Sequence, residues 1–276
     1  MPKPIELPIS AAWMYMSDDQ QYNTIPQTWS KINFKNVDVL NVGPGGVQSN
    51  GTFGLFNSDE TGDLANRFKW IIQTARNQNP NIKIIISQWW GDQGDHIWGK
   101  GLDSLDGDKA IPTYTSSVIE FLHSYLNVSG GVDGYDIDYE SNNVVSNISK
   151  ITSLIRLGMN GLSETFKRPF YLTVSPSTTT YLDKAVGSLN FVNMQTYAGG
   201  VYLTPQDFTK LGLKSQQLLY GICPETNCDS PEIPAVESAY TKNNLAGIHL
   251  WRLNSGDYIK EGQWQAQIYR FLHPQS

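Results

Sequence analysis

Cysteine, charge and long apolar runs are all scarce in this sequence. The two cysteines, Cys223 and Cys228, are five residues apart, so they could close a small disulfide loop or remain free thiols. A metal site at this pair would need ligands from elsewhere in the chain. No window of about 18 apolar residues exists, and the N-terminus lacks the basic-then-apolar layout of a signal peptide. We therefore expect a soluble protein with no membrane partner.

The charge balance excludes partners that carry many phosphates. Lys and Arg number 20 against 26 Asp and Glu, which gives a net charge of -6. Such a surface repels nucleic acid, so we expect none as a partner. Asn-x-Ser/Thr triplets at Asn50, Asn127 and Asn147 would accept glycans in a secretory route, although chance also accounts for them. We expect an extracellular or secreted location, and a cytoplasmic one stays open.

The sequence is well supplied with apolar and aromatic residues. Hydrophobic residues make up 39% and aromatic residues 12%, which suffices for a core and excludes disorder, collagen and coiled coil. Short β-branched runs alternate with longer segments of helical period, a pattern typical of βα units around a parallel sheet. The expected strands span residues 11–15, 37–42, 82–87, 134–139, 170–175, 191–197, 217–221 and 247–251.

Five helices are expected between these strands. They span residues 64–77, 114–126, 147–166, 235–243 and 264–272. Within residues 114–126, apolar positions recur every three or four residues and form one stripe that needs a sheet to cover. No linker divides the chain, and the alternation of strands and helices runs through its whole length. The sequence therefore predicts the α/β class and a single (β/α)8 TIM barrel, with residues 1–276 as one monomeric domain.

The segment from Asp133 to Glu140, Asp-Gly-Tyr-Asp-Ile-Asp-Tyr-Glu, carries the main functional signal. Alternate side chains of a strand share a face, so Asp136, Asp138 and Glu140 point one way and the apolar residues point the other. The apolar face has to meet the helices, which puts the carboxylates inside the barrel, toward the end where barrel enzymes keep their chemistry. Crowded carboxylates cannot all ionise, so we expect one of them to hold a proton and act as a general acid.

Two other interpretations of this strand are weaker. An edge strand could turn an acidic face to water, but the Gly-Gly entry and the downstream helix favour a central position in a parallel sheet. A magnesium or manganese site could use grouped carboxylates, yet no matching His or acidic cluster follows the other strands. We therefore expect neither a metal nor a cofactor.

Residues 133–140 resemble the fourth-strand motif of glycoside hydrolase family 18, Asp-Gly-x-Asp-x-Asp-x-Glu, with all four acidic positions present. The family contains chitinases and endo-β-N-acetylglucosaminidases. Residues 194–197 (Met-Gln-Thr-Tyr) resemble its sixth-strand segment, and residues 247–251 (Gly-Ile-His-Leu-Trp) resemble its last strand. The resemblance implies a catalytic barrel that performs retaining endo-hydrolysis of β-1,4 linkages next to N-acetylglucosamine, in chitin or chitooligosaccharides.

The same resemblance implies a role for each matched residue. Glu140 would protonate the leaving oxygen while the 2-acetamido carbonyl of the substrate attacks the anomeric carbon, which gives an oxazolinium ion. Asp138 would orient the acetamido group and balance the positive charge, and Asp136 would exchange a proton with Asp138. Tyr197 would donate to the acetamido oxygen, and Trp251 would lie under the sugar ring.

Further substrate-binding residues are expected at neighbouring strand ends. Gln195 and Met194 belong to the matched sixth-strand segment. Trp89 and Trp90 follow the third strand, where the family commonly has Ser-x-Gly-Gly, so the fit of a substrate there stays open. The next loop could line outer sugar subsites through Trp98, Asp92, Asp95 and His96.

One region of the family's larger members is missing. About 25 residues separate the seventh and eighth expected strands, too few for the additional domain that deepens the cleft in many chitinases. We expect a barrel without a large insertion domain, and a shallow, open cleft.

Three alternative functions stay open. An endo-β-N-acetylglucosaminidase that cleaves the chitobiose core of N-glycans would share the motif and differ in its loops. Many barrel glycosidases instead pair an acid after the fourth strand with a nucleophile after the seventh, which would make Glu140 and Glu225 the pair. A lectin could also keep the cleft without the chemistry. The expected partner is an oligosaccharide or polysaccharide that contains N-acetylglucosamine.

Overall fold

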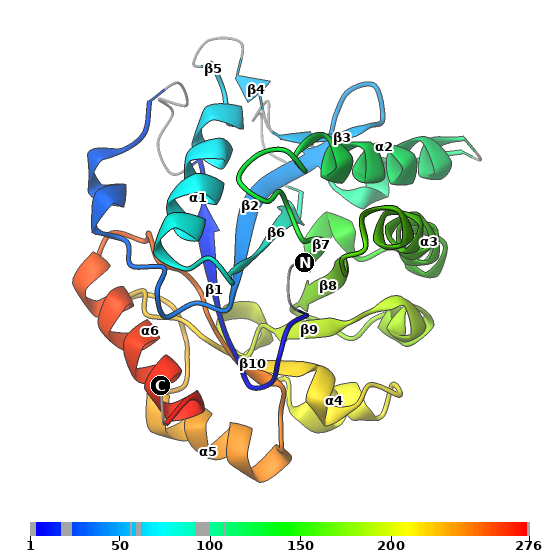
Figure 1. Cartoon of the computed structure of the whole chain (residues 1–276). Helices are drawn as coiled ribbons and strands as arrows, with labels where there is room; N and C mark the ends of the chain where they lie inside the picture. The colour runs from blue at the N-terminus through cyan, green and yellow to red at the C-terminus, as the bar shows by residue number, and fades with distance from the viewer. Residues whose placement is uncertain are drawn as a thin grey trace.

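Eight parallel strands close into a barrel in the computed structural model, which describes residues 4–17, 24–55, 57–58, 62–91, 100–107 and 109–274 (Figure 1). In barrel order the strands are β1 (Ile9–Tyr15), β2 (Val39–Val47), β6 (Lys83–Gln88), β7 (Gly134–Tyr139), β8 (Tyr171–Pro176), β9 (Phe191–Met194), β10 (Leu218–Ile222) and β11 (Gly247–Leu250). Strand β1 pairs with β2 on one side and with β11 on the other, and this double pairing closes the barrel. The predicted TIM barrel and its eight strands are confirmed.

Helices surround this barrel on the outside (Figure 1). They are α1 (Ala65–Gln78), α2 (Ala110–Ser124), α3 (Ile148–Phe166), α4 (Pro205–Thr209), α5 (Ile233–Asn243) and α6 (Tyr258–Leu272). All five expected helices are present. Helix α2 begins four residues before the predicted start, because Pro112 lies in its first turn, where a proline is tolerated. Helix α6 also begins early, where the Asp257 side chain caps it by accepting from the Lys260 N–H at 3.0 Å.

Shorter elements complete the connections. Strand β3 (Phe53–Leu55) pairs antiparallel with the end of β2, and β4 (Asn57–Ser58) pairs with β5 (Gly62–Asp63). Turns of 3-10 helix occur at Gln27–Lys31, Leu102–Ser104, Ser141–Asn143, Leu182–Lys184, Val186–Ser188, Ala198–Gly200 and Ser215–Gln217. The sequence did not predict these elements or α4, because each is too short to show a hydrophobic period.

The barrel interior changes from apolar to polar along its axis. The floor, at the N-terminal ends of the strands, is a cluster that includes Ile9, Val39, Ile85 and Leu219. The separate core between strands and helices contains the outward side chains of every long strand, for example Ile137. Above the floor the inward side chains of β6 to β9 are polar and buried, and these are Ser87, Asp136, Thr173, Asn193, Asp138, Ser175 and Gln195. The polar residues therefore gather near the C-terminal rim, where the active site of a barrel enzyme is expected.

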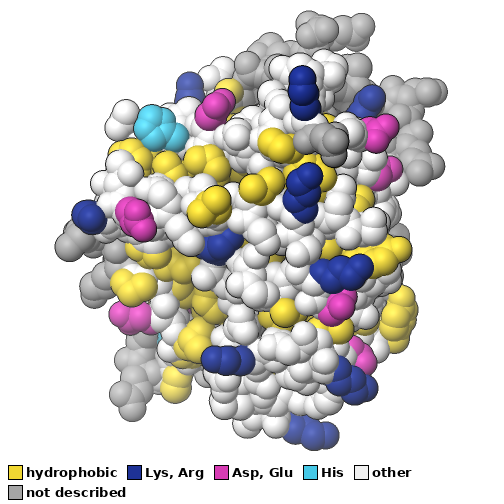
Figure 2. Space-filling model, turned by 90° about the vertical axis from the view of Figure 1, so that its right-hand side faces the viewer, with side chains coloured by type: hydrophobic (Ala, Val, Ile, Leu, Met, Phe, Trp, Pro, Cys, Tyr) yellow, Lys and Arg dark blue, Asp and Glu magenta, His cyan; other side chains and the backbone are white. Residues whose placement is uncertain are grey.

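On the face drawn in Figure 2, basic and acidic side chains are scattered among apolar ones. Within the described part of the chain, no helix combines the length and the apolar character that crossing a bilayer requires.

Candidate active site

Strand β7 presents its carboxylates to the barrel interior. Asp136 is fully buried and Asp138 is 6% exposed, while Tyr135, Ile137 and Tyr139 pack into the outer core. The alternation predicted from the sequence is therefore present. Glu140 follows the strand directly and is half-buried at the rim. The three carboxylates form a column that rises from the barrel interior to the surface.

Asp136 lies at the bottom of this column among hydrogen-bond donors from three strands. Its carboxylate accepts from the hydroxyls of Ser87 at 2.8 Å, Thr173 at 2.6 Å and Ser175 at 3.1 Å, and from the Asn193 amide at 3.4 Å. Burial raises the pKa of Asp136 to about 6, and the hydrogen bonds oppose that rise. Asp136 can therefore gain or lose a proton near neutral pH.

Asp138 and Glu140 are hydrogen-bonded to each other and share Gln195. The Gln195 amide donates to Asp138 Oδ1 at 2.8 Å and to Glu140 Oε1 at 3.3 Å, and it is anchored on the Ser175 carbonyl at 2.8 Å. Burial raises the pKa of Asp138 well above its ordinary value, and the neighbouring charge of Glu140 adds to the rise. Burial also raises the pKa of Glu140. The two carboxyl groups therefore titrate as a coupled pair.

A pocket of about 280 Å³ opens above the carboxylates. Its wall consists of Trp13, Trp90, Asp138, Glu140, Gln195, Tyr197, Ala198, Glu225, Asn227, Cys228 and Trp251. Gly221 of β10 has no side chain, and Tyr197 and His249 pack closely against it. A Cβ at this position would lie 2.7 Å from the Tyr197 ring and 2.8 Å from His249 Nε2. His249 lies below, fully buried, with Nε2 2.9 Å from the Met194 carbonyl, and burial lowers its pKa to about 4.

Tyr197 and Trp251 both line this pocket. Within the described part of the chain, the Tyr197 hydroxyl has no hydrogen-bond partner, and burial together with the nearby carboxylates raises the pKa of this phenol. Tyr197 is therefore a neutral donor. Trp251 packs against Trp13, with 5.2 Å between ring centroids, and these two indoles form an apolar part of the pocket wall.

Two residues expected to bind substrate lie elsewhere. The side chain of Met194 is fully buried in the outer core, because strand alternation turns it away from the side that Asn193 and Gln195 share. The expectation for Met194 is therefore corrected. Trp89 is not part of the pocket wall but packs behind Trp90, with 4.8 Å between ring centroids. Trp98, Asp92, Asp95 and His96 lie outside the described residues.

The sequence did not identify all of the pocket wall. Trp13 comes from β1, the first strand, and reaches the site only because the closed barrel places β1 beside β11. Asn227 and Cys228 come from the loop after β10, which the disulfide between Cys223 and Cys228 closes. Glu225 of the same loop was expected near the site only as the alternative nucleophile. Among the described residues, no group of three or more His, Cys, Asp or Glu side chains is arranged to hold a metal ion.

Asp133, the first acidic residue of the motif, has a different environment. It is 2% exposed at the start of β7, forms ion pairs with Arg76 at 2.6 Å and with Arg168, and accepts from the Ile84 N–H at 2.8 Å. These contacts join α1, β6 and the segment before β8 at the opposite end of the strand from the pocket. Asp133 therefore fixes the position of β7 and does not reach the pocket.

Solved structures similar to this chain include enzymes of glycoside hydrolase family 18, whereas no protein-family model and no curated protein sequence matches it. An N-acetylglucosaminidase from Paenibacillus barengoltzii aligns over 95% of this chain and 99% of its own, with a TM-score of 0.67 and 13% identity. A chitinase from Cycas revoluta, solved in complex with (GlcNAc)3, covers 95% and 99%, with a TM-score of 0.66 and 15% identity. A fungal endo-β-N-acetylglucosaminidase covers 98% and 100%, with a TM-score of 0.64 and 15% identity.

These similarities establish the fold. At the level of fold, they confirm the resemblance to family 18 that the motif of β7 indicates.

Proposed function

We propose that this chain is a glycoside hydrolase, a single catalytic barrel that cleaves β-1,4 linkages next to N-acetylglucosamine with retention of configuration. The observation that carries the proposal is the column of Asp136, Asp138 and Glu140 at the base of a pocket, where burial raises the pKa of all three carboxyl groups. Burying Asp136 and Asp138 beside a third carboxylate costs stability, so the arrangement is best explained by a reaction that uses these groups.

The reaction begins with the substrate's own acetamido group. Its carbonyl oxygen attacks the anomeric carbon as the glycosidic bond breaks, and Glu140 gives its proton to the departing oxygen. Asp138 accepts a hydrogen bond from the acetamido N–H and balances the positive charge of the oxazolinium ion, and Tyr197 donates to the acetamido oxygen. Glu140 then takes a proton from water as the water opens the oxazolinium, which restores the original configuration.

Asp136 and Gln195 support the charge on Asp138 during this cycle. With a pKa near 6, Asp136 can accept the proton that Asp138 releases when positive charge develops above it. The bond from Gln195 keeps the Asp138 carboxylate aimed at the pocket.

A nucleophilic role for Glu225 is the rival mechanism, and the contacts weigh against it. The Glu225 carboxylate is ion-paired with Arg252 at 3.0 Å, which lowers its reactivity toward carbon. A pair of Glu140 and Glu225 would also leave Asp136 and Asp138 without a function. We therefore prefer participation by the substrate.

For the substrate we propose chitin-type oligosaccharides, because the strand sequence Asp-Ile-Asp-Tyr-Glu is close to that of chitinases. The N-glycan core presents the same acetamido group, and the loops would choose between the two. Mass spectrometry of products from chitin oligomers and from a high-mannose glycoprotein, run in parallel, tests this choice. Release of a high-mannose glycan without cleavage of chitin oligomers would reassign the substrate.

The activity itself is tested with a 4-nitrophenyl chitobioside. The wild-type protein should release nitrophenol, and Glu140→Gln should lose at least about 1,000-fold in kcat because it cannot donate the proton. If the protein binds chitotriose but releases no nitrophenol, and Glu140→Gln binds equally well, the chain is a lectin and the proposal fails.

A further inference from the structure

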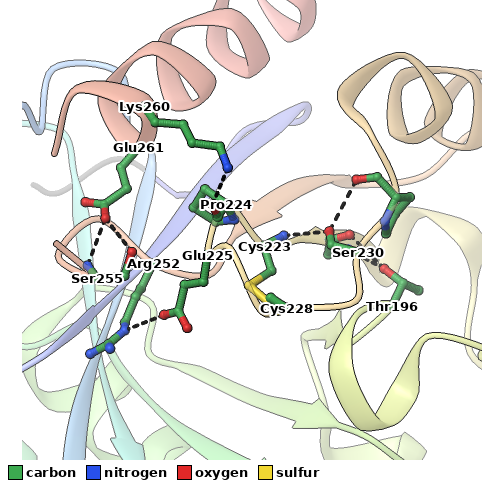
Figure 3. The surroundings of a disulfide bond; sticks show 12 residues. Thr196, Cys223, Pro224, Glu225, Cys228, Ser230, Arg252, Ser255, Lys260 and Glu261 are labelled. Atoms are coloured by element: carbon green, nitrogen blue, oxygen red, sulfur yellow. Dashed lines mark hydrogen bonds and ion pairs between the residues drawn. A yellow bond between two sulfur atoms is a disulfide. The ribbon is translucent and has the colours of Figure 1, made fainter. Parts of the chain in front are cut away.

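The loop after β10 is cross-linked and tied to its surroundings (Figure 3). We call residues 223–228 the disulfide loop, since the disulfide between Cys223 and Cys228 closes it. The Cys223 N–H donates to Ser230 Oγ at 2.9 Å, and Lys260 Nζ of α6 donates to the Pro224 carbonyl at 2.5 Å. The backbone of the disulfide loop is therefore held at its first two residues, and the disulfide ties its last residue to its first.

This loop places the carboxylate of Glu225 in the wall of the sugar pocket. Arg252 Nε donates to Glu225 Oε1 at 3.0 Å (Figure 3). The Arg252 guanidinium in turn lies against the rings of Tyr15 at 5.4 Å and Trp251 at 5.7 Å. Within the described part of the chain, this carboxylate makes no other hydrogen bond, and its side chain is 32% exposed. One carboxylate oxygen is thus held by Arg252, while the partly exposed side chain lines the pocket.

Stability does not account for a third acidic group at this position. A partly exposed ion pair contributes little to folding. The pocket already contains Asp138 and Glu140, and Glu225 adds negative charge close enough to raise the pKa of Tyr197 further. An oriented carboxylate beside an aromatic ring is, however, the acceptor that binds a sugar hydroxyl most strongly.

We propose that Glu225 is a specificity-determining residue that accepts a hydrogen bond from a ring hydroxyl of the N-acetylglucosamine unit lying on Trp251. Arg252 and the disulfide loop hold the carboxylate in the orientation that this bond requires, so little freedom is lost on binding. Glu225 forms and breaks no covalent bond. This inference rests on the proposed function, since it takes that sugar as the ligand.

The first test compares Glu225→Ala and Glu225→Gln with wild type on a 4-nitrophenyl chitobioside. Glu225→Ala should raise KM about 10-fold or more and leave kcat within about threefold. The variant loses a charged acceptor that binds the sugar hydroxyl equally well in the ground state and in the transition state. Glu225→Gln keeps an acceptor and should raise KM less. The matched control is Glu232→Gln, an exposed residue on the same connection outside the pocket wall, which should change neither constant. A KM unchanged in Glu225→Ala, or a kcat that collapses about 1,000-fold in Glu225→Gln, would overturn the proposal.

The second test identifies the hydroxyl. Chitobiosides that lack the 3-, 4- or 6-hydroxyl of one sugar are assayed with wild type and with Glu225→Ala. With the analogue that lacks the contacted hydroxyl, wild type and Glu225→Ala should have the same KM. The missing hydroxyl and the substitution each remove the same hydrogen bond, so the second change has no further effect. An equal penalty for all analogues would refute the contact, since a merely structural role weakens every substrate.

A separate measurement keeps the two proposals distinguishable. If wild-type protein cleaves none of these glycosides, the proposed function fails. Calorimetric titration with chitotriose then tests the inference alone, with the affinity of wild type expected to exceed that of Glu225→Ala about 10-fold or more. Equal affinities of wild type and Glu225→Ala for chitotriose would overturn the inference about Glu225.

Discussion

Replacing Asp138 by Asn removes the carboxylate charge that develops on Asp138 during the proposed reaction and changes little else. Asn has nearly the same volume, and its carbonyl can still accept the bond that Gln195 donates to Asp138 at 2.8 Å. In the proposed mechanism, Asp138 lies next to the oxazolinium ion, at a charge separation of about 4 Å. At an effective dielectric constant of about 20, that pair is worth roughly 4 kcal/mol.

The variant loses this energy only in the transition state, where the positive charge develops. The kcat should therefore fall about 1,000-fold, and KM should change by less than about threefold. Initial rates on a 4-nitrophenyl chitobioside give both constants. The matched control is Asp106→Asn, an exposed aspartate outside the pocket wall, which should retain wild-type rates. The melting temperature of Asp138→Asn should not decrease, because the change relieves repulsion between buried carboxylates. A folded Asp138→Asn protein with kcat within about tenfold of wild type would refute the reasoning.

Three further predictions follow from the contacts described above. Asp133→Asn should lower the free energy of unfolding by about 3–5 kcal/mol in urea titrations, because Arg76 and Arg168 lose their buried counter-charge, and a loss below about 1 kcal/mol would contradict this. The pKa of Asp136 rises from 3.8 to about 6 on folding, so the folded state binds an extra proton between these pH values. The free energy of unfolding should therefore fall by about 3 kcal/mol as the pH rises from 4 to 7. This pH dependence should be weaker in Asp136→Asn, and an unchanged pH dependence would contradict the prediction. Tyr197→Phe should reduce kcat roughly 10- to 100-fold on the chitobioside at unchanged melting temperature, and full activity would show that the hydroxyl does not contact the reacting group.

The sequence predicted the parts of the fold that repeat a simple period. The eight strands follow from apolar runs, and the inward position of Asp136 and Asp138 follows from strand alternation, which the structure shows. The same rule, applied strictly, would have excluded Met194, which is adjacent to Gln195 and so faces the other way. The alternation of side chains along a strand therefore predicts what a side chain contacts better than its place in a matched motif does.

The rest of the site depends on contacts between distant parts of the chain. Trp13 meets Trp251 because the barrel closes between the first and last strands, and no local pattern records that pairing. The cysteine spacing allowed either a disulfide or free thiols, and the position of Cys228 in the pocket wall follows only from the path of the loop. The partners of Asp133 are likewise far away in sequence, at Arg76 and Arg168.

The central claim is that the substrate's acetamido oxygen is the nucleophile. The most direct test measures kcat for a series of chitobiosides in which the acetyl group of the cleaved sugar carries zero, one, two or three fluorine atoms. Fluorine withdraws electrons from that oxygen while the shape changes little, so we predict a progressive fall of more than about 100-fold across the series. A kcat that stays level across it would contradict the account and transfer the nucleophilic role to a protein side chain.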